Sequence, residues 1–142
     1  MDNSNLPSYL EYKGKYKGIF AWIFSTDHKR IGLLYMYSIM AFFVVAAVLG
    51  LLMKFELIAP GKTIMEAKSY NAVFTLHGIT MIFLVVVPGI PAILGNFFLP
   101  ILIGAKDVFY PRLNLLSWWL YIIGAVIALS SQFMNGESPD TG

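Results

Sequence analysis

The sequence predicts an all-α integral membrane protein in which three helices cross the bilayer. Of its 142 residues, 58% are hydrophobic and 13% are charged, whereas an average soluble domain carries about 25% charged residues. Three apolar stretches, at about 31–53, 70–103 and 115–133, reach the length of about 20 residues that one crossing needs. A soluble chain of this length could not bury so much apolar surface in a core. The excess is therefore expected to face lipid.

The first 30 residues form a polar arm, expected at the cytoplasmic membrane interface ahead of a membrane domain at 31–142. The arm lacks the compact apolar stretch of a cleaved signal peptide. It interleaves basic with aromatic residues, a combination typical of a membrane interface. Residues 25–27 (Ser-Thr-Asp) suit the N-cap of the first span. The basic and aromatic residues are Lys13, Lys15, Lys17, Lys29 and Arg30, with Tyr9, Tyr12, Tyr16, Phe20, Trp22 and Phe24.

The second span is longer than a single crossing requires, so it must tilt, kink or project from the bilayer. Pro88 and Pro91, with Gly89 between them, lie near its middle. Proline removes a backbone donor and bends a helix, which leaves carbonyl groups without their helical partners. In lipid such carbonyls need partners from neighbouring helices. This span is therefore expected inside a helix bundle.

Lysine and arginine predict the orientation. The arm carries five of them and the loop at 104–114 carries two, Lys106 and Arg112, while the loop at 54–69 carries three. In a chain with three spans the arm and the 104–114 loop lie on the same side of the membrane. The positive-inside rule places that side, and with it the N-terminus, in the cytoplasm.

Composition narrows the classes of function. The chain has no cysteine, which excludes disulfides, thiolate metal sites and thiol nucleophiles. Its net charge of +2 is too small to indicate a nucleic-acid partner. The sequence has no internal repeat, so it gives no support to a transporter built from inverted repeats.

His77 is the one strongly polar ionisable residue within a predicted span. A histidine there is rare and usually faces the bundle interior. Gly78 leaves room on one side, and Phe74 and Met81 share its helix face. A neutral imidazole among small or apolar residues suits an axial ligand of haem iron. The residues alone leave open the alternative, an interhelical hydrogen bond with ordinary packing neighbours.

Three polar residues near the cytoplasmic side form a second candidate site. Asp107 lies in the loop, Asn96 in the inner half of the second span, and Asn114 at the start of the third. An acid at a pore mouth followed by amides could order a water chain that conducts protons. The residues alone favour a simpler alternative, a solvated loop acid and an asparagine N-cap. Lys54 lies at the outer end of the first span. A lysine in such a place usually snorkels, extending its charged end to the membrane interface.

Four strings carry a resemblance to one known family. They are 25–35 (STDHKRIGLLY), 74–83 (FTLHGITMIF), 95–114 (GNFFLPILIGAKDVFYPRLN) and 138–142 (SPDTG). In order, they resemble the start of the first helix, the low-spin haem ligand region, the end of the second helix with the loop that follows it, and the loop after the third helix of haem–copper terminal oxidase subunit I (cytochrome c oxidase subunit 1). The resemblance covers about residues 20–142, in the family's order and spacing.

The resemblance implies a place in a bundle of about twelve helices that couples oxygen reduction to proton translocation. His77 would be an axial ligand of the low-spin haem iron. The residues implied to line that haem are Ala47, Gly50, Met53, Lys54, Tyr70, Phe74, Gly78 and Met81.

Two further sites follow from the same resemblance. Glu56 and Gly61 match a peripheral sodium or calcium site near the outer surface. Asp107 matches the acid at the mouth of the proton path called the D channel. Asn96 and Asn114 match the asparagines that organise water in that path.

The chain departs from the family pattern at Lys54, where the family usually has an arginine that bonds the formyl group of haem a. The resemblance favours haem a. Lysine is a point charge rather than a planar fork, and this difference leaves haem b as the alternative. Apolar or small residues replace the polar set of the quinol-oxidising branch, which favours cytochrome c as electron donor. These residues are Val45, Leu49, Ser69 and Ala72.

The family's second low-spin haem ligand, high-spin haem and copper ligands lie in later helices. The resemblance therefore implies that residues 1–142 are an N-terminal portion, inactive alone, of a subunit in the bacterial inner membrane. Its expected partners are the remainder of subunit I, subunits II and III, cytochrome c and lipid, and not nucleic acid. A small non-catalytic haem-binding or assembly protein is the alternative, and a transporter fragment is a weaker one.

Overall fold

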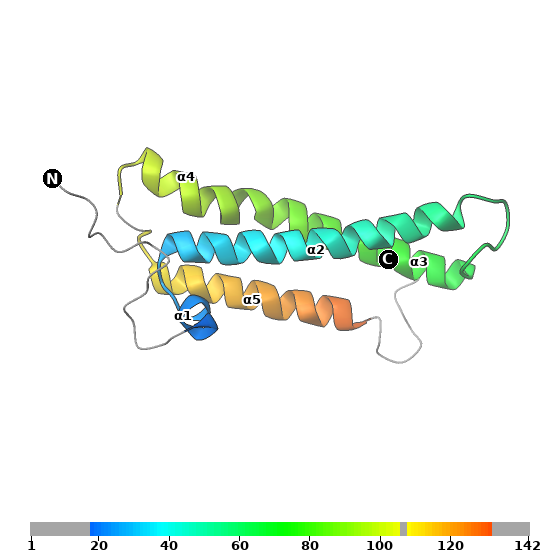
Figure 1. Ribbon diagram of the computed structural model, residues 1–142, viewed down its shortest axis with the longest axis horizontal. Helices are drawn as coiled ribbons and strands as arrows, with labels where there is room; N and C mark the ends of the chain where they lie inside the picture. Colours follow the sequence, from blue (N-terminus) through cyan, green and yellow to red (C-terminus); the bar gives the residue numbers. More distant parts are fainter. Residues whose placement is uncertain (1–17, 106–107, 132–142) are drawn as a thin grey trace.

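The computed structural model describes residues 18–105 and 108–131, and every regular element in these ranges is helical. A short helix, α1 (Ile19–Ile23), precedes the long helix α2 (His28–Glu56). The second span comprises α3 (Ala67–Ile79), two π-helical segments, η1 (Thr80–Val86) and η2 (Gly89–Leu94), and α4 (Gly95–Leu102). The last helix is α5 (Pro111–Ser130). Figure 1 shows α2 lying between α4 and α5, and α2 contacts both.

Three helices of the described chain are long and apolar enough to cross a membrane, at His28–Glu56, Ala67–Leu102 and Pro111–Ser130. This finding confirms the predicted all-α class with three spans. Each helix begins three or four residues before the apolar stretch expected from the sequence, because polar residues can form the first turn. The Asp27 side chain caps α2 by accepting a hydrogen bond from the Lys29 backbone at 2.9 Å, as predicted. Pro111 begins α5, where its missing N–H costs nothing.

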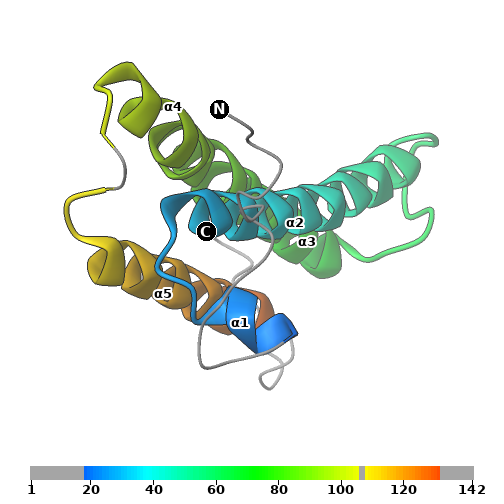
Figure 2. The ribbon, with the colours of Figure 1, turned by 60° about the vertical axis from the view of Figure 1, so that its left-hand side comes forward.

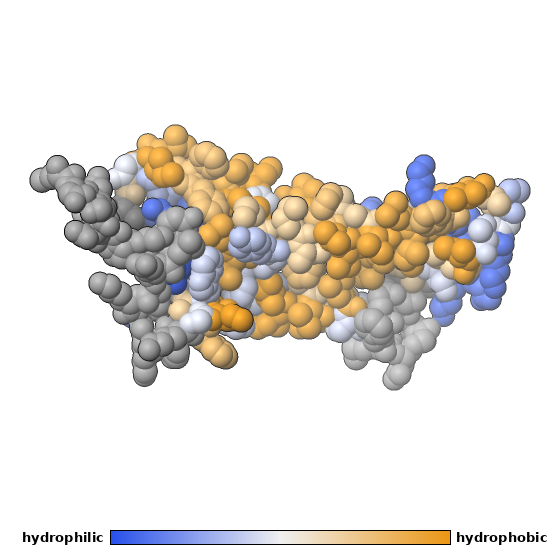
Figure 3. Space-filling view, viewed as in Figure 1, coloured by the Kyte–Doolittle hydropathy of each residue, from blue (hydrophilic) through white to orange (hydrophobic). Residues whose placement is uncertain are grey.

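Most of the apolar surface faces outward. Only 11% of the most apolar window of each span is buried within the chain. Figure 3 shows hydrophobic residues over the middle of the molecule, with hydrophilic residues near its ends. A small core of Ile31, Tyr35, Ile39 and Trp118 joins α2 to α5. Such a surface suits lipid or further helices rather than water.

The helix α1 is held against the start of α2 and the side of α5 (Figure 2). The buried Arg30 guanidinium lies 5.3 Å from the centre of the Trp22 ring, within cation–π range. The Phe24 and Trp119 rings lie 5.9 Å apart and connect this region to α5. The described part of the arm therefore packs on the helices it precedes.

The second span widens at its prolines instead of breaking. The π-helical turns lie on both sides of Pro88 and include Pro91, which confirms that this region is distorted. Pro88 has no N–H, so the Leu84 carbonyl four residues earlier loses its α-helical donor. The Tyr121 hydroxyl of α5 donates a hydrogen bond to that carbonyl at 2.6 Å. A neighbouring helix thus supplies the missing donor, as lipid requires.

Replacing Tyr121 by Phe should lower the free energy of unfolding of the assembled protein by about 0.6–2 kcal/mol, because one buried carbonyl loses its partner. Thermal unfolding in detergent would measure the change. Tyr37→Phe is the matched control, since the Tyr37 side chain is 62% exposed. Equal losses in the two variants would contradict the assigned role of the hydroxyl.

Candidate functional site

His77 lies on α3, ten residues after its start, or about 15 Å along the helix axis. Its Nδ1 is 2.8 Å from the Ala46 carbonyl oxygen of α2. A carbonyl only accepts hydrogen bonds, so Nδ1 carries the proton in this contact and Nε2 keeps a lone pair. Metal-binding histidines are commonly oriented in this way, by a backbone carbonyl on the other ring nitrogen.

Glycine at position 50 lets the imidazole approach α2 closely. A Cβ atom at Gly50 would lie 3.1 Å from His77 Cε1. At Gly78, by contrast, a Cβ would meet nothing within 4 Å, and the Phe74 side chain is 61% exposed. A ring fixed against one helix, with an available nitrogen and apolar neighbours, fits the requirements of a haem ligand.

The other residues predicted around the haem lie along the same two helical spans. Ala47 and Lys54 are exposed on α2, where Met53 is half-buried. Tyr70 on α3 and Met81 on η1 are half-buried. The structure therefore puts the predicted haem residues on neighbouring helices, with Gly50 in direct contact distance of the ligand candidate.

The structure brings Asn96 and Asn114 together. Asn114 donates from Nδ2 to the Asn96 Oδ1 at 2.5 Å, and Asn96 donates to the Ala92 carbonyl at 2.6 Å. Asn114 is not an N-cap, because α5 begins at Pro111 and Tyr110 occupies the cap position. The simpler interpretation of Asn114 is thereby wrong. Asp107 lies outside the described residues.

Two hydroxyl residues that the sequence did not single out extend this polar pair. Ser117 donates to the Asn114 carbonyl at 2.7 Å, which uses its only proton. Tyr35 of α2 therefore donates to the Ser117 oxygen, at 2.8 Å. Ser117 lies three residues after Asn114 on one face of α5, a signal that could have identified it. Tyr35 is 82 residues away in sequence from Ser117 and had no such signal.

Two open pockets lie beside the polar pair of Asn96 and Asn114. One, of about 290 Å³, includes Tyr35 and Tyr121 in its lining. The other, of about 420 Å³, includes Val108 and Tyr110 beside the 104–110 loop. Each has room for several water molecules, which occupy about 30 Å³ apiece in the liquid. Both are lined by Pro91, Asn96, Asn114 and Ser117.

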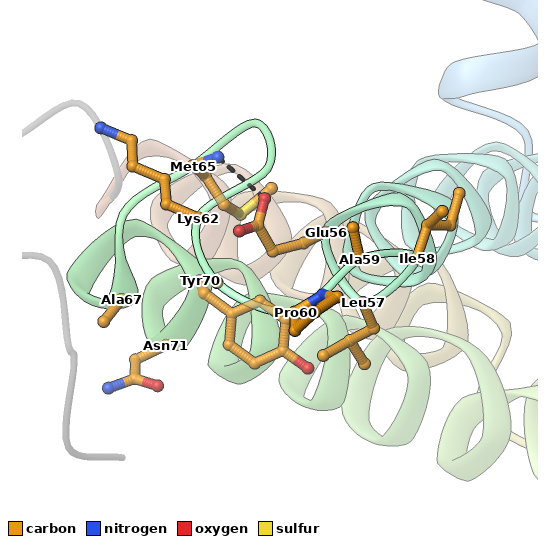
Figure 4. Close-up of a pocket in the computed structure, with 11 residues that line it drawn as sticks. Glu56, Leu57, Ile58, Ala59, Pro60, Lys62, Met65, Ala67, Tyr70 and Asn71 are labelled. Atoms are coloured by element: carbon orange, nitrogen blue, oxygen red, sulfur yellow. Dashed lines mark hydrogen bonds between the residues drawn. The ribbon is translucent and has the colours of Figure 1, made fainter.

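At the opposite end of the molecule, the Glu56 carboxylate binds the backbone of the loop that follows α2. Its Oε1 accepts from the Thr63 backbone at 3.0 Å, and its Oε2 from Ile64 and Met65 at 2.7 and 2.9 Å. Figure 4 shows Glu56 pointing toward Met65, with the hydrogen bond between them dashed. Gly61 lines the same pocket, of about 590 Å³, so the two residues of the predicted cation site lie at one place. Among the described residues no group of three or more His, Cys, Asp or Glu side chains could hold a metal ion.

Comparison with known proteins agrees with the resemblance. The profile of the family described as "Cytochrome C and Quinol oxidase polypeptide I" matches residues 30–142. "Probable cytochrome c oxidase subunit 1-alpha" of Streptomyces avermitilis is 42% identical over 121 residues, 85% of this chain and 21% of that protein. "Heme-copper oxidase subunit I+III" of Aeropyrum pernix is 37% identical over 124 residues, 87% of this chain and 15% of that protein.

The chain thus spans about a fifth of the length of the curated relatives it matches first. The matched region begins at residue 30, within the first turn of α2, and includes the rest of the first span and all of the other two. Because the family profile covers most of the sequence, the chain belongs to the cytochrome c and quinol oxidase polypeptide I family.

Proposed function

We propose that the chain forms the N-terminal part of the catalytic subunit of a proton-translocating cytochrome c oxidase and that His77 is an axial ligand of its low-spin haem. One observation carries the proposal. The Ala46 carbonyl holds His77 Nδ1 at 2.8 Å, which leaves Nε2 available to iron. The family supports an oxidase subunit, and oxygen reduction itself falls to the remainder of the protein.

The chain's own residues would hold and orient the haem. His77 supplies the ligand nitrogen, the Ala46 carbonyl fixes its tautomer, and Phe74 offers an exposed apolar surface. The haem, when bound, supplies one-electron transfer at a potential tuned by these surroundings. The family favours haem a, and haem b is the alternative because Lys54 stands where an arginine would bond the formyl group of haem a.

The polar lining near the opposite end suits proton uptake. Asn96, Asn114 and Ser117 line two open pockets large enough for water, at the end of the bundle near the 104–110 loop. Polar residues at membrane depth are costly and often mark proton paths. Asp107, in that loop, is proposed as the acid at the mouth of the path.

The proposed location is the bacterial inner membrane, with the N-terminus in the cytoplasm. The positive charges of the arm and of the 104–114 loop support this orientation. The proposed partners are the remainder of subunit I, subunits II and III, and cytochrome c as electron donor. One relative's name joins subunits I and III in a single chain.

Replacing His77 by Ala should abolish the low-spin haem band, because the iron loses a ligand. The measurement is a reduced-minus-oxidised visible spectrum of membranes that contain the assembled oxidase, and the position of the band distinguishes haem a from haem b. An unchanged spectrum would show that His77 is a packing residue and that the haem assignment is wrong.

Replacing Asn114 by Ala should slow proton uptake about tenfold, which corresponds to about 1.4 kcal/mol in the barrier. The variant loses the hydrogen bond that orients Asn96 in the cavity. Stopped-flow measurement with a pH indicator and oxidase in vesicles would detect the change. Asn71→Ala, which alters an exposed asparagine beside the opposite loop, is the control, and equal effects would contradict the path.

Replacing Glu56 by Gln should speed hydrogen exchange at the amides of Thr63, Ile64 and Met65. A glutamine side chain has one acceptor oxygen where the carboxylate has two, so it cannot hold all three donors. Mass spectrometry of the exchanging protein would measure the rates. If a sodium or calcium site is also present, adding the cation should slow exchange in the unmodified protein but not in the variant. Unchanged rates in the variant would contradict the role of Glu56 in closing the loop.

A further inference from the structure

Gly50 of α2 lies so close to the His77 ring that a side chain at position 50 would require the ring to move by a few tenths of an ångström. A Cβ atom there would lie 3.1 Å from Cε1, 3.5 Å from Nδ1 and 3.9 Å from Nε2. We propose that Gly50 is a positioning residue for His77, whose missing side chain sets the orientation of the imidazole and hence the spectroscopic properties of the haem it binds. This inference rests on the proposed function.

The three distances show which edge of the ring α2 covers. Cε1 is nearest to the built atom, Nδ1 is next, and Nε2 is farthest of the three. The Ala46 carbonyl, one helical turn before Gly50, binds Nδ1 from the same face of α2. The helix therefore takes the Nδ1–Cε1 edge of the ring and leaves Nε2 as the nitrogen directed away from the contact.

A methyl group at position 50 would act on the ring before it acts on the helix. Carbon atoms prefer separations of about 3.5–4.0 Å, so a contact at 3.1 Å requires a movement of a few tenths of an ångström. The α2 backbone is fixed by packing on α3, η1, η2, α4 and α5. Rotation of an imidazole about its last side-chain bond is softer, because that torsion has broad minima. The expected result is a turned ring with a weaker bond to Ala46.

A second glycine on α2 provides a matched control. Gly32 lies 18 residues before Gly50, five helical turns away and thus on the same face. A Cβ atom there would lie 3.0 Å from the Phe97 ring and 3.1 Å from the Asn96 Cβ. Gly32→Ala therefore crowds the same two spans by a similar amount, far from His77. It separates a general packing defect from an effect on the haem ligand.

The test compares Gly50→Ala with Gly32→Ala in the assembled oxidase. The measurements are the electron paramagnetic resonance spectrum of the oxidised low-spin haem and its reduced-minus-oxidised absorption band, each normalised to the amount of subunit on an immunoblot. Gly50→Ala should retain the haem and shift both the g values and the band. Gly32→Ala should leave both unshifted.

The other possible outcomes either support the inference about Gly50 or overturn it. Loss of the low-spin haem in Gly50→Ala alone, with normal subunit amounts, would also support it, since the damage is confined to the ligand. Unshifted spectra in Gly50→Ala, or equal changes in both variants, would overturn it. The His77→Ala variant distinguishes failure of the inference about Gly50 from failure of the proposed function. If that variant loses the haem while Gly50→Ala changes nothing, only the role of Gly50 fails, and if it keeps the haem, the proposed function fails.

Discussion

A backbone carbonyl in lipid must have a donor, and the second span contains prolines that remove donors at its centre. The structure meets this requirement with wider helical turns and with the Tyr121 hydroxyl on the Leu84 carbonyl. That bond ties α5 to the middle of the second span. Two helical turns earlier on α5, Asn114 then meets Asn96. The distortion and the polar pair thus belong to one interface.

The relative placement of the helices depends on a few polar contacts. Apolar side chains contact lipid about as favourably as they contact each other, so they give helices little reason to choose one register. Each long helix here bonds another through specific atoms: His77 to Ala46, Tyr35 to Ser117, and the Trp118 indole to the Ser38 hydroxyl at 3.2 Å. Glycines at positions 32 and 50 allow the close approach of α2 to the second span.

The features that sequence alone could predict are local ones. The three spans, the Asp27 cap and the distortion near Pro88 follow from apolar runs, capping chemistry and the missing proline donor. The bond between Tyr35 and Ser117 joins residues 82 positions apart, and no local pattern encodes such a pairing. The same is true of Glu56. Its carboxylate binds backbone amides of the loop, and the side chains of those residues give no indication of the contact. His77 stood out because an ionisable residue in an apolar run is rare, but its partner on α2 is a backbone carbonyl, which any residue could have provided.

In the proposed function the two candidate sites lie in opposite halves of one continuous span. His77 and Asn96 are 19 residues apart, about 28 Å if the span were α-helical throughout, and the π-helical turns lie between them. Each is in close contact with α2, at Gly50 and Gly32 respectively. Because α2 is one uninterrupted helix, it holds both ends of the second span while the turns between them are irregular. The distance from the proposed haem ligand to the proposed proton path is therefore set by α2 rather than by the distorted span that carries both groups.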